Sequence, residues 1–376
     1  MSFYESLDVP PVVNAATTFT ALGGSLMPDV VLDAMRSAAG SFVDMHALHL
    51  AAGRRLAELT NNEAAYATAG CGAAMVLSVL AARNRGNPGI LNELPARERA
   101  PYEVIMHAAH RIPYDKMVQL AGATIRQIGD MQQTFAWELE SAIDERTAAI
   151  LYVAGSHLPQ VALPLEEVVG IARRHDVPVI VDAAAQLPPM ENLWRFTRDL
   201  GADVALFSGG KALRGPQASG LMVGRKDLVE AARQNGAPFQ RWARPMKAGK
   251  EEIAGLVAAV DRFVHLDHDS LHAEWTRTVS TWHEDLSTMA GLRVTPDALN
   301  EAGQPVPRLH VEVLDSGSAR RVLEALDAAQ PRIAVLPDLN NGVPRGFWIG
   351  PDLLKPGEDT LVMKTISTLV HQFTEE

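Results

Sequence analysis

Residues 204–216 read VALFSGGKALRGP, which is an apolar run, a Ser-Gly-Gly turn, a lysine and a second turn at Gly215-Pro216. The apolar run Val204–Ser208 is typical of a buried strand, and the glycines let the backbone fold tightly around a ligand. A lysine in a loop is usually solvated, so its presence alone predicts no chemistry. Here Lys211 directly follows a buried strand, and Ser208 offers a hydroxyl group to a phosphate. Lys211 is therefore the first candidate for a reactive group.

The sequence around this stretch alternates between short apolar runs and helical patterns. Continuous apolar strands between helices predict an α/β fold with a mostly parallel sheet covered by helices on both faces. The predicted strands are Ala64–Thr68, Glu103–Met106, Thr124–Ile128, Ala148–Val153, Val177–Val181, Val204–Ser208 and Gly220–Val223. The predicted helices are Pro28–Ala39, His46–Thr60, Ala73–Arg83, Tyr114–Ala121, Ala136–Ile143 and Leu165–His175.

The pattern changes near residue 250, where longer helices and alternating strands predict a smaller α+β domain. We expect an N-terminal arm at 1–27, a large domain at 28–250 and a small C-terminal domain at 251–376. The helices predicted in this region are Glu252–Leu266, Ser270–Met289, Ala319–Ala329 and Thr360–Thr374. The predicted strands are Arg308–Leu314, Arg332–Leu336 and Gly346–Ile349.

A carboxylate and an amide follow the strand at 177–181, where the chain continues as Asp182-Ala183-Ala184-Ala185-Gln186. Open α/β sheets place ligand groups at the carboxyl ends of their strands. Asp182 could instead cap a helix, as aspartate often does. Between Asp182 and Lys211 there is room for one segment and one strand, so both side chains are expected at the same edge of the sheet.

A glycine-rich turn, Gly70-Cys71-Gly72, follows the strand Ala64–Thr68 and precedes a helix. Two glycines allow close approach of a ligand, and a helix N-terminus offers free N–H groups and a positive dipole end. Many strand-to-helix turns are rich in glycine for steric reasons alone. Neither this turn nor the lysine loop has the nucleotide-binding spacing of a P-loop or a dinucleotide fingerprint.

Two histidines and an arginine follow the strand Glu103–Met106, in the order His107, His110 and Arg111. His110 is the candidate for a flat side chain that stacks on a cofactor ring, and His107 is its competitor. Either histidine could equally be a hydrogen-bonded structural residue. Arg111 could bind a phosphate or carboxylate with its two-pronged guanidinium group.

The glycine turn, the histidine, the aspartate and the Ser-Gly-Gly-Lys loop, in this order, resemble fold-type-I enzymes that use pyridoxal 5'-phosphate (PLP). Further motifs resemble the bacterial selenocysteine synthase family, and especially its stand-alone relatives, the D-glucosaminate-6-phosphate ammonia-lyase group. Selenocysteine synthases carry an extra N-terminal tRNA-binding region before the first of these motifs, and this chain begins almost at that motif. The motifs are Val13–Thr17, Gly23–Ser25, Phe42–Met45, Glu63–Ala65, Gly215–Gly220, Arg244–Lys247, Gly249–Glu252 and Lys355–Glu358.

The resemblance implies a role for each candidate residue. Lys211 would bind PLP as a Schiff base and then remove the α-proton of the substrate. Asp182 would hold the protonated pyridine nitrogen, and His110 would stack on the ring. The remaining cofactor-binding candidates, most of them phosphate ligands, are Gly70, Cys71, Gly72, Ser208 and Gln186.

Substrate binding is assigned to two arginines and the N-terminal arm. Arg111 and Arg308 are candidates for a substrate carboxylate, although each could form an ordinary surface ion pair. Asn14 and Thr17 lie in an arm that lines the site in folds of this kind. Such sites are commonly built from two subunits, so we expect a homodimer or a larger homo-oligomer.

Composition limits the partners and the compartment. The formal net charge of -11 disfavours nucleic acid, including seryl-tRNA. The lone Cys71 leaves no disulfide framework and no cysteine-based metal site, and we expect no metal. No apolar run has the roughly 18 residues of a membrane span. We therefore expect a cytoplasmic enzyme that acts on a small molecule.

The leading hypothesis is a PLP-dependent lyase for a small hydroxylated amino acid or amino sugar acid. It would remove the α-proton and expel the β-hydroxyl group, giving a 2-keto acid and ammonia. The alternative is an amino-acid racemase or epimerase, which shares the first step. A non-catalytic PLP-binding protein is a third hypothesis, which leaves the Asp182–Lys211 pair without a purpose.

Overall fold

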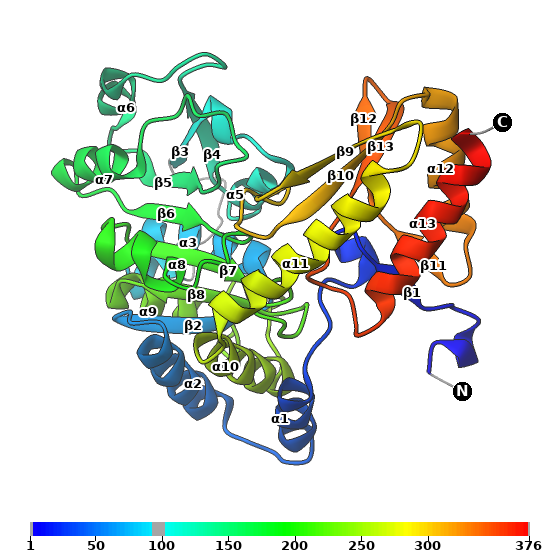
Figure 1. Ribbon diagram of the computed structural model, residues 1–376. Helices are drawn as coiled ribbons and strands as arrows, with labels where there is room; N and C mark the ends of the chain where they lie inside the picture. Colours follow the sequence, from blue (N-terminus) through cyan, green and yellow to red (C-terminus); the bar gives the residue numbers. More distant parts are fainter. Residues whose placement is uncertain (1–2, 92–101, 375–376) are drawn as a thin grey trace. The chain divides into compact units, whose positions relative to one another are not determined.

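The computed structural model describes residues 3–91 and 102–374, and these residues form two compact units (Figure 1). The larger unit is Ser25–Leu266. The smaller unit combines the residues up to Gly24 with those from Asp267 onward.

These two units differ from the predicted N-terminal arm, large domain and small C-terminal domain. The predicted domain boundaries stay a prediction. Helix α10 (Lys250–Val264) lies in the larger unit because it packs against α1 (Asp29–Ala39) and α2 (Met45–Leu59). The Lys250 ammonium group also donates to the Ala38 carbonyl oxygen at 2.7 Å. In the smaller unit, β1 (Val12–Asn14) of the arm pairs in parallel with β11 (Arg332–Ala334).

The described part of the larger unit contains a seven-stranded sheet in the order β2-β8-β7-β6-β5-β3-β4. Strand β8 runs antiparallel to both of its neighbours, because the short loop after β7 returns the chain directly beside it. The other neighbouring pairs are parallel. The strands are β2 (Ala64–Thr68), β3 (Glu103–His107), β4 (Thr124–Ile128), β5 (Thr147–Val153), β6 (Val179–Asp182), β7 (Val204–Ser208) and β8 (Gly220–Gly224). The predicted mostly parallel α/β sheet is confirmed.

Helices cover both faces of this sheet and form a separate apolar core on each face. One core contains side chains of α3 (Cys71–Asn84), α5 (Lys116–Leu120) and α9 (Lys226–Asn235). Helix α3 is apolar on all sides, is half-buried over its first three residues and is almost fully buried from Ala74 onward. The other core contains side chains of α2, α6 (Ala136–Ala142), α7 (Leu165–Arg174), α8 (Asn192–Trp194) and α10.

The smaller unit has an antiparallel sheet in the order β12-β13-β10-β9. Its strands are β9 (Leu292–Asp297), β10 (Arg308–Val313), β12 (Leu336–Asn340) and β13 (Val343–Ile349). Its helices are α11 (His268–Ser287), α12 (Ser316–Ala328) and α13 (Glu358–Thr374). The sheet and all three helices contribute to one apolar core, together with Val13 of the arm.

Three features differ from the sequence prediction. The single strand predicted at Arg332–Leu336 is wrong, because β11 and β12 pair with different strands, β1 and β13. Helix α9 and strand β9 carry many polar residues and were not predicted. The one segment expected between Asp182 and the strand at 204–208 includes the π-helix Arg195–Asp199, whose wide hydrogen-bonding pattern leaves no mark on apolar periodicity.

His49 on α2 makes the stability of the larger unit depend on pH. Its side chain is 3% exposed, and burial lowers its pKa to about 4, with smaller contributions from Arg233 and His46. Because the folded-state pKa lies below the ordinary value of 6.5, the stability is complete above pH 6.5 and falls as the pH drops toward 4. Burial lowers the pKa of His107 to about 4 and that of His110 to about 3, which acts in the same direction.

We predict that His49→Leu makes unfolding less sensitive to acid. The free energy of unfolding of the wild type falls between pH 7.5 and pH 4.5. Without the buried ring, this fall should be smaller by up to about 3 kcal/mol. The measurement is chemical denaturation at several pH values, with the exposed His265→Leu as control. Equal pH dependence in wild type and His49→Leu would refute the assignment.

Among residues 3–91 and 102–374, no helix is both long and apolar enough to cross a membrane.

Candidate active site

The predicted cofactor-binding residues lie at or just beyond the carboxyl ends of β2, β3, β6 and β7, at one edge of the seven-stranded sheet. Asp182 is the last residue of β6, and Ser208 is the last residue of β7. Cys71 is the first residue of α3, which follows β2. The parallel order of the strands brings together side chains that are far apart in the sequence.

Asp182 is buried at this edge, with 6% of its surface exposed. Its Oδ1 atom accepts a hydrogen bond from the Ala184 N–H at 3.1 Å and lies 3.7 Å from the Cys71 sulfur. Burial raises the pKa of Asp182, while the Ala184 N–H, the positive charge of Lys211 and the Cys71 thiol oppose this rise. A buried carboxylate of this kind is best stabilised by a cationic partner.

The Cys71 thiol, on the first residue of α3, lies beside the Asp182 carboxylate. Burial raises its pKa well above the usual range, the Asp182 carboxylate raises it further, and Lys211 acts in the opposite direction. The thiol therefore keeps its proton at neutral pH and is a poor nucleophile.

The Lys211 loop is held tightly by close backbone packing. The Gly209 N–H donates to the Ser219 carbonyl oxygen at 2.9 Å, and the Gly215 N–H donates to the Gly209 carbonyl oxygen at 2.8 Å. A Cβ atom added at Gly209 would lie 2.0 Å from the Ser219 Oγ atom, and one added at Gly210 would lie 2.5 Å from the Gln217 Cα atom. Both glycines are needed because the loop folds back on itself with no room for a side chain.

Ser25 is a residue near the lysine to which sequence analysis gave no role. Its N–H and its hydroxyl group both donate to the Gly210 carbonyl oxygen at 3.0 Å. This tether fixes the peptide directly before Lys211. The signal in the sequence was its place in the Gly23–Ser25 motif, but spacing alone does not show that this motif meets the lysine loop.

The glycine turn before α3 crosses strand β8 at very close range. A Cβ atom added at Gly220 would lie 2.5 Å from the Gly70 carbonyl carbon and 2.7 Å from the Thr68 hydroxyl oxygen. Gly70 has a φ of 89°, a value that favours glycine. The first N–H groups of α3, including those of Cys71 and Gly72, have no acceptor within the helix, so they are available to an anion.

His110 and His107 form an aromatic cluster with Tyr152 of β5. The rings of His110 and Tyr152 have centroids 4.5 Å apart, and those of His110 and His107 are 4.9 Å apart. The His110 Nδ1 atom accepts a hydrogen bond from the Val153 N–H at 3.3 Å. Both His107 ring nitrogens are buried without a partner among the described residues. Stacking of His110 on a cofactor ring stays a prediction.

Gln186 is nearly buried beyond the end of β6. Its side-chain amide donates to the Ala185 carbonyl oxygen at 2.9 Å. A Cβ atom added at Gly155 would lie 3.0 Å from this amide nitrogen and 2.3 Å from the His157 ring, so Gln186 and His157 pack over the same glycine. Sequence analysis did not select His157.

Arg111 lies beyond the end of β3, but acidic and amide side chains already hold its guanidinium group. Its Nε atom lies 2.5 Å from the Asp115 carboxylate, and another nitrogen donates to Gln127 at 3.1 Å. A substrate carboxylate would therefore have to displace one of these partners.

The other three substrate-binding candidates belong to the smaller unit. The Asn14 side chain bridges a turn, donating to the Thr17 carbonyl oxygen and accepting from the Ala16 N–H, each at 3.0 Å. The Thr17 hydroxyl group donates to Glu301 at 2.5 Å. Arg308 lies 3.2 Å from the Asp297 carboxylate, and its guanidinium carbon lies 3.9 Å from the centroid of the Trp348 ring.

Comparison with known families gives a clear match. Residues 12–318 match the SelA family, described as L-seryl-tRNA selenium transferase. The chain belongs to this family. The match spans all of the larger unit and about half of the smaller one, and it includes every candidate site residue.

The relatives of this chain differ from one another in the activity that they are named for. The chain is 36% identical over 341 residues to a 5'-C-glycyluridine monooxygenase-decarboxylase from Streptomyces sp, covering 88% of this chain and 83% of the relative. It is 33% identical over 317 residues to the D-glucosaminate-6-phosphate ammonia lyase of Salmonella typhimurium, covering 83% of this chain and 82% of the relative. A solved structure of a D-glucosaminate-6-phosphate ammonia-lyase matches with a TM-score of 0.85 and 28% identity, over 100% of this chain and 99% of the other.

More distant structures confirm the fold-type-I architecture of PLP enzymes. The serine palmitoyltransferase of Sphingomonas wittichii matches with a TM-score of 0.61 at 14% identity, over 96% of this chain and 88% of that one. The fold predicted from the sequence is thus confirmed, and PLP is the cofactor.

The residues at the sheet edge fit this cofactor. The buried Asp182 carboxylate suits a protonated pyridine nitrogen, which would relieve the cost of its burial. The start of α3 and the Ser208 hydroxyl group offer hydrogen-bond donors to a phosphate. Among the described residues, no group of three histidine, cysteine or acidic side chains is arranged to hold a metal ion.

We predict that Gly220→Ala weakens PLP binding. The added methyl group would push the Gly70 turn away from β8, and overpacking of this kind costs about 1–3 kcal/mol. Titration of the purified protein with PLP measures the loss of affinity, and thermal melting measures the loss of stability. The control is Gly170→Ala, where an added Cβ meets nothing within 4 Å. Unchanged PLP affinity in Gly220→Ala would show that the crossing does not shape the cofactor site.

Proposed function

We propose that this chain is a PLP-dependent lyase that acts on a small hydroxylated amino acid or amino sugar acid. It removes the α-proton and the β-hydroxyl group and yields a 2-keto acid and ammonia. The similarity to D-glucosaminate-6-phosphate ammonia lyase, in sequence and in structure over nearly the whole chain, supports this reaction type.

The observation that carries the proposal is the buried Asp182 carboxylate within electrostatic reach of Lys211, beside the free N–H groups of α3. When bound here, PLP supplies an electron sink that stabilises negative charge at the substrate α-carbon. Asp182 holds the cationic form of the ring nitrogen, on which this stabilisation depends. The N–H groups of Cys71 and Gly72 and the Ser208 hydroxyl group fix the phosphate.

Lys211 has two roles in this proposal. Its amine would hold the cofactor covalently, and the same amine would serve as the base that takes the α-proton of the substrate. Ser25 and the closed loop around Gly209 position this amine by holding the peptide before it. His110 and Gln186 contact the cofactor from the neighbouring strand ends.

The atoms of the reaction balance without a further reagent. The substrate loses its α-proton and its β-hydroxyl group, which together leave as water. The enamine released then takes up one water molecule and separates into a 2-keto acid and ammonia. No oxidant is consumed, which separates this reaction from that of an oxygenase.

Arg111 and Arg308 are the proposed partners of a substrate carboxylate, with Asn14 and Thr17 contributing from the arm. Each arginine is now paired with an acidic side chain, so binding exchanges one carboxylate for another. The proposal includes assembly as a homodimer or larger homo-oligomer in the cytoplasm.

A second candidate function follows from the Streptomyces relative, whose name describes a monooxygenase and decarboxylase. That chemistry breaks the bond to a carboxyl group and consumes dioxygen. It would need the same Lys211 and Asp182, so the site residues do not separate the two functions.

Product analysis with and without dioxygen separates the candidates. The holoenzyme is incubated with a panel of D- and L-hydroxy amino acids and amino sugar acids, in air and under nitrogen. The proposed lyase releases equal amounts of ammonia and 2-keto acid under both conditions. Carbon dioxide that forms only in air would favour the second candidate. Loss of optical activity without ammonia would instead favour the racemase hypothesis.

A further inference from the structure

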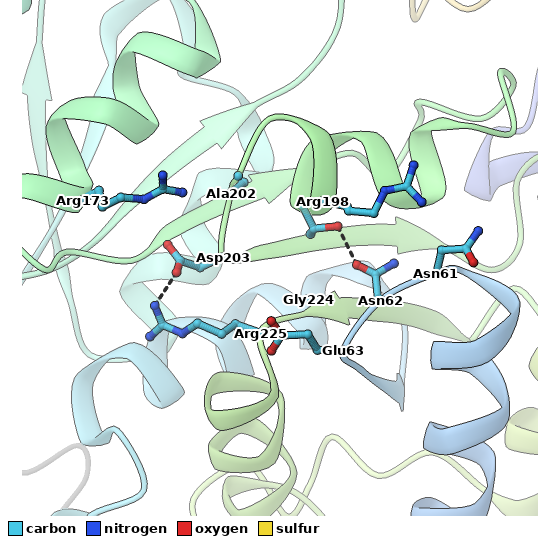
Figure 2. Close-up of a pocket in the computed structure, with 11 residues that line it drawn as sticks. Asn61, Asn62, Glu63, Arg173, Arg198, Ala202, Asp203, Gly224 and Arg225 are labelled. Carbon is cyan, nitrogen blue, oxygen red and sulfur yellow. Dashed lines mark hydrogen bonds and ion pairs between the residues drawn. The ribbon is translucent and has the colours of Figure 1, made fainter.

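A second pocket lies at the opposite edge of the seven-stranded sheet from Asp182 and Lys211. Its lining residues come from the amino ends of β2 and β7, the carboxyl end of β8, helix α7 and the π-helix Arg195–Asp199. The cavity has a volume of about 430 Å³, within the range of sites that bind small metabolites (Figure 2). All of these residues belong to the larger unit.

Hydrogen-bond donors hold the two acidic side chains of this pocket in place. Asp203 accepts hydrogen bonds from the Val179 N–H at 2.7 Å and from the Arg225 guanidinium group at 2.5 Å. Glu63 accepts from the Lys226 N–H at 3.1 Å. Arg225 also binds Asp227 at 2.7 Å, so it is fully occupied as well. These groups form a fixed frame around the cavity.

Arg173 is the cationic group in this frame that has room for a ligand. Within the part of the chain that the structure describes, no hydrogen bond or ion pair within 4 Å holds its guanidinium group, and its charge acts on the Asp203 carboxylate at longer range. Figure 2 shows this side chain extending toward Ala202 and Asp203. It lies directly over Gly201, where an added Cβ would come within 2.8 Å of a guanidinium nitrogen. Gly201 has a φ of 80°, so the backbone favours glycine at the point where the guanidinium group needs space.

The π-helix contributes a second cation and a hydroxyl group. Arg198 lies at the pocket with half of its side chain exposed, and its Nε atom pairs with the neighbouring Asp199 at 2.9 Å. The Thr197 hydroxyl group donates to the Asn62 side chain at 2.5 Å, which anchors the π-helix to the segment before β2. Helices of this type are rare and are found frequently at functional sites.

We propose that this pocket binds a small phosphate-bearing molecule, with Arg173 as the main phosphate ligand and Arg198 at the rim. A guanidinium group binds a phosphate through two parallel hydrogen bonds, and Arg173 has its donors free for this purpose. The site is separate from the cofactor site, since the two lie at opposite ends of the same strands. The inference does not depend on which reaction the enzyme performs.

The test is calorimetric titration of the PLP-loaded enzyme with inorganic phosphate at constant ionic strength. Bound PLP fills the cofactor's own phosphate site, so that site does not contribute. Wild type should show saturable binding of one phosphate per chain at this pocket. Arg173→Gln should weaken it by about tenfold or more, because a charge-assisted hydrogen bond is lost. Arg198→Gln should weaken it to a smaller extent.

The matched control is Arg174→Gln. Arg174 is the next residue of α7 and is exposed like Arg173, but its guanidinium group pairs with Glu140 at 2.6 Å. Phosphate affinity should be unchanged in this variant. Absence of saturable binding in wild type, or equal affinity in wild type and Arg173→Gln, would overturn the proposal. If Arg173→Gln does not fold, unaltered binding in Arg198→Gln would overturn it instead.

Discussion

Lys211→Ala is expected to lower kcat/KM by at least about 10⁴-fold, because the variant loses both the covalent attachment of PLP and the base for the α-proton. PLP should still bind, since Asp182, the start of α3 and Ser208 remain in place. Its visible absorbance should change because the link to the lysine is gone. Steady-state kinetics and an absorbance spectrum measure the two effects.

The control for this prediction is Lys226→Ala, which removes an exposed lysine at the start of α9. It should leave both kcat/KM and the spectrum unchanged. Restoration of part of the Lys211→Ala activity by a small added amine would further support a role in proton transfer. Activity in Lys211→Ala within tenfold of wild type would refute the assignment.

Asp182→Asn is expected to lower kcat by about 10²–10³-fold, the usual cost of removing one charged group that stabilises a transition state. The amide keeps the shape of the side chain and can still accept from the Ala184 N–H. It cannot hold a protonated ring nitrogen, so the cofactor loses its strength as an electron sink. KM should change much less than kcat, since no substrate contact is removed.

A matched control for this change is Asp176→Asn. Asp176 is an exposed aspartate that precedes β6 and pairs with Arg85 at 2.5 Å. Its replacement should leave kcat unchanged. A similar kcat in Asp182→Asn and wild type would show that Asp182 is only a structural residue at the end of its strand.

The parts of the fold that rest on apolar periodicity were predictable. Strands β2, β4 and β7 have the predicted bounds. The runs of β2 and β7 are buried, whereas β4 is a half-exposed strand at the edge of the sheet. The meeting of Asp182 and Lys211 at one edge also followed from the sequence, since parallel strands place their carboxyl ends together.

Other features depend on tertiary contacts that leave no local signal. The tether from Ser25 to the Gly210 carbonyl joins segments 185 residues apart, and nothing in their spacing indicates it. The pairing of β1 with β11, which joins the arm to the smaller unit, is likewise a contact between distant segments that spacing does not indicate. The pairing of Arg111 with Asp115 is different, because the two residues are only four apart and the Asp115 side chain is buried.

The central claim is that Lys211 carries the cofactor, and borohydride trapping tests it most directly. The holoenzyme is reduced with borohydride and digested with a protease, and the masses of its peptides are measured by mass spectrometry. We expect the reduced cofactor to be attached to the peptide that contains Lys211. Attachment to a different lysine, or no attachment in a protein that has bound PLP, would contradict it.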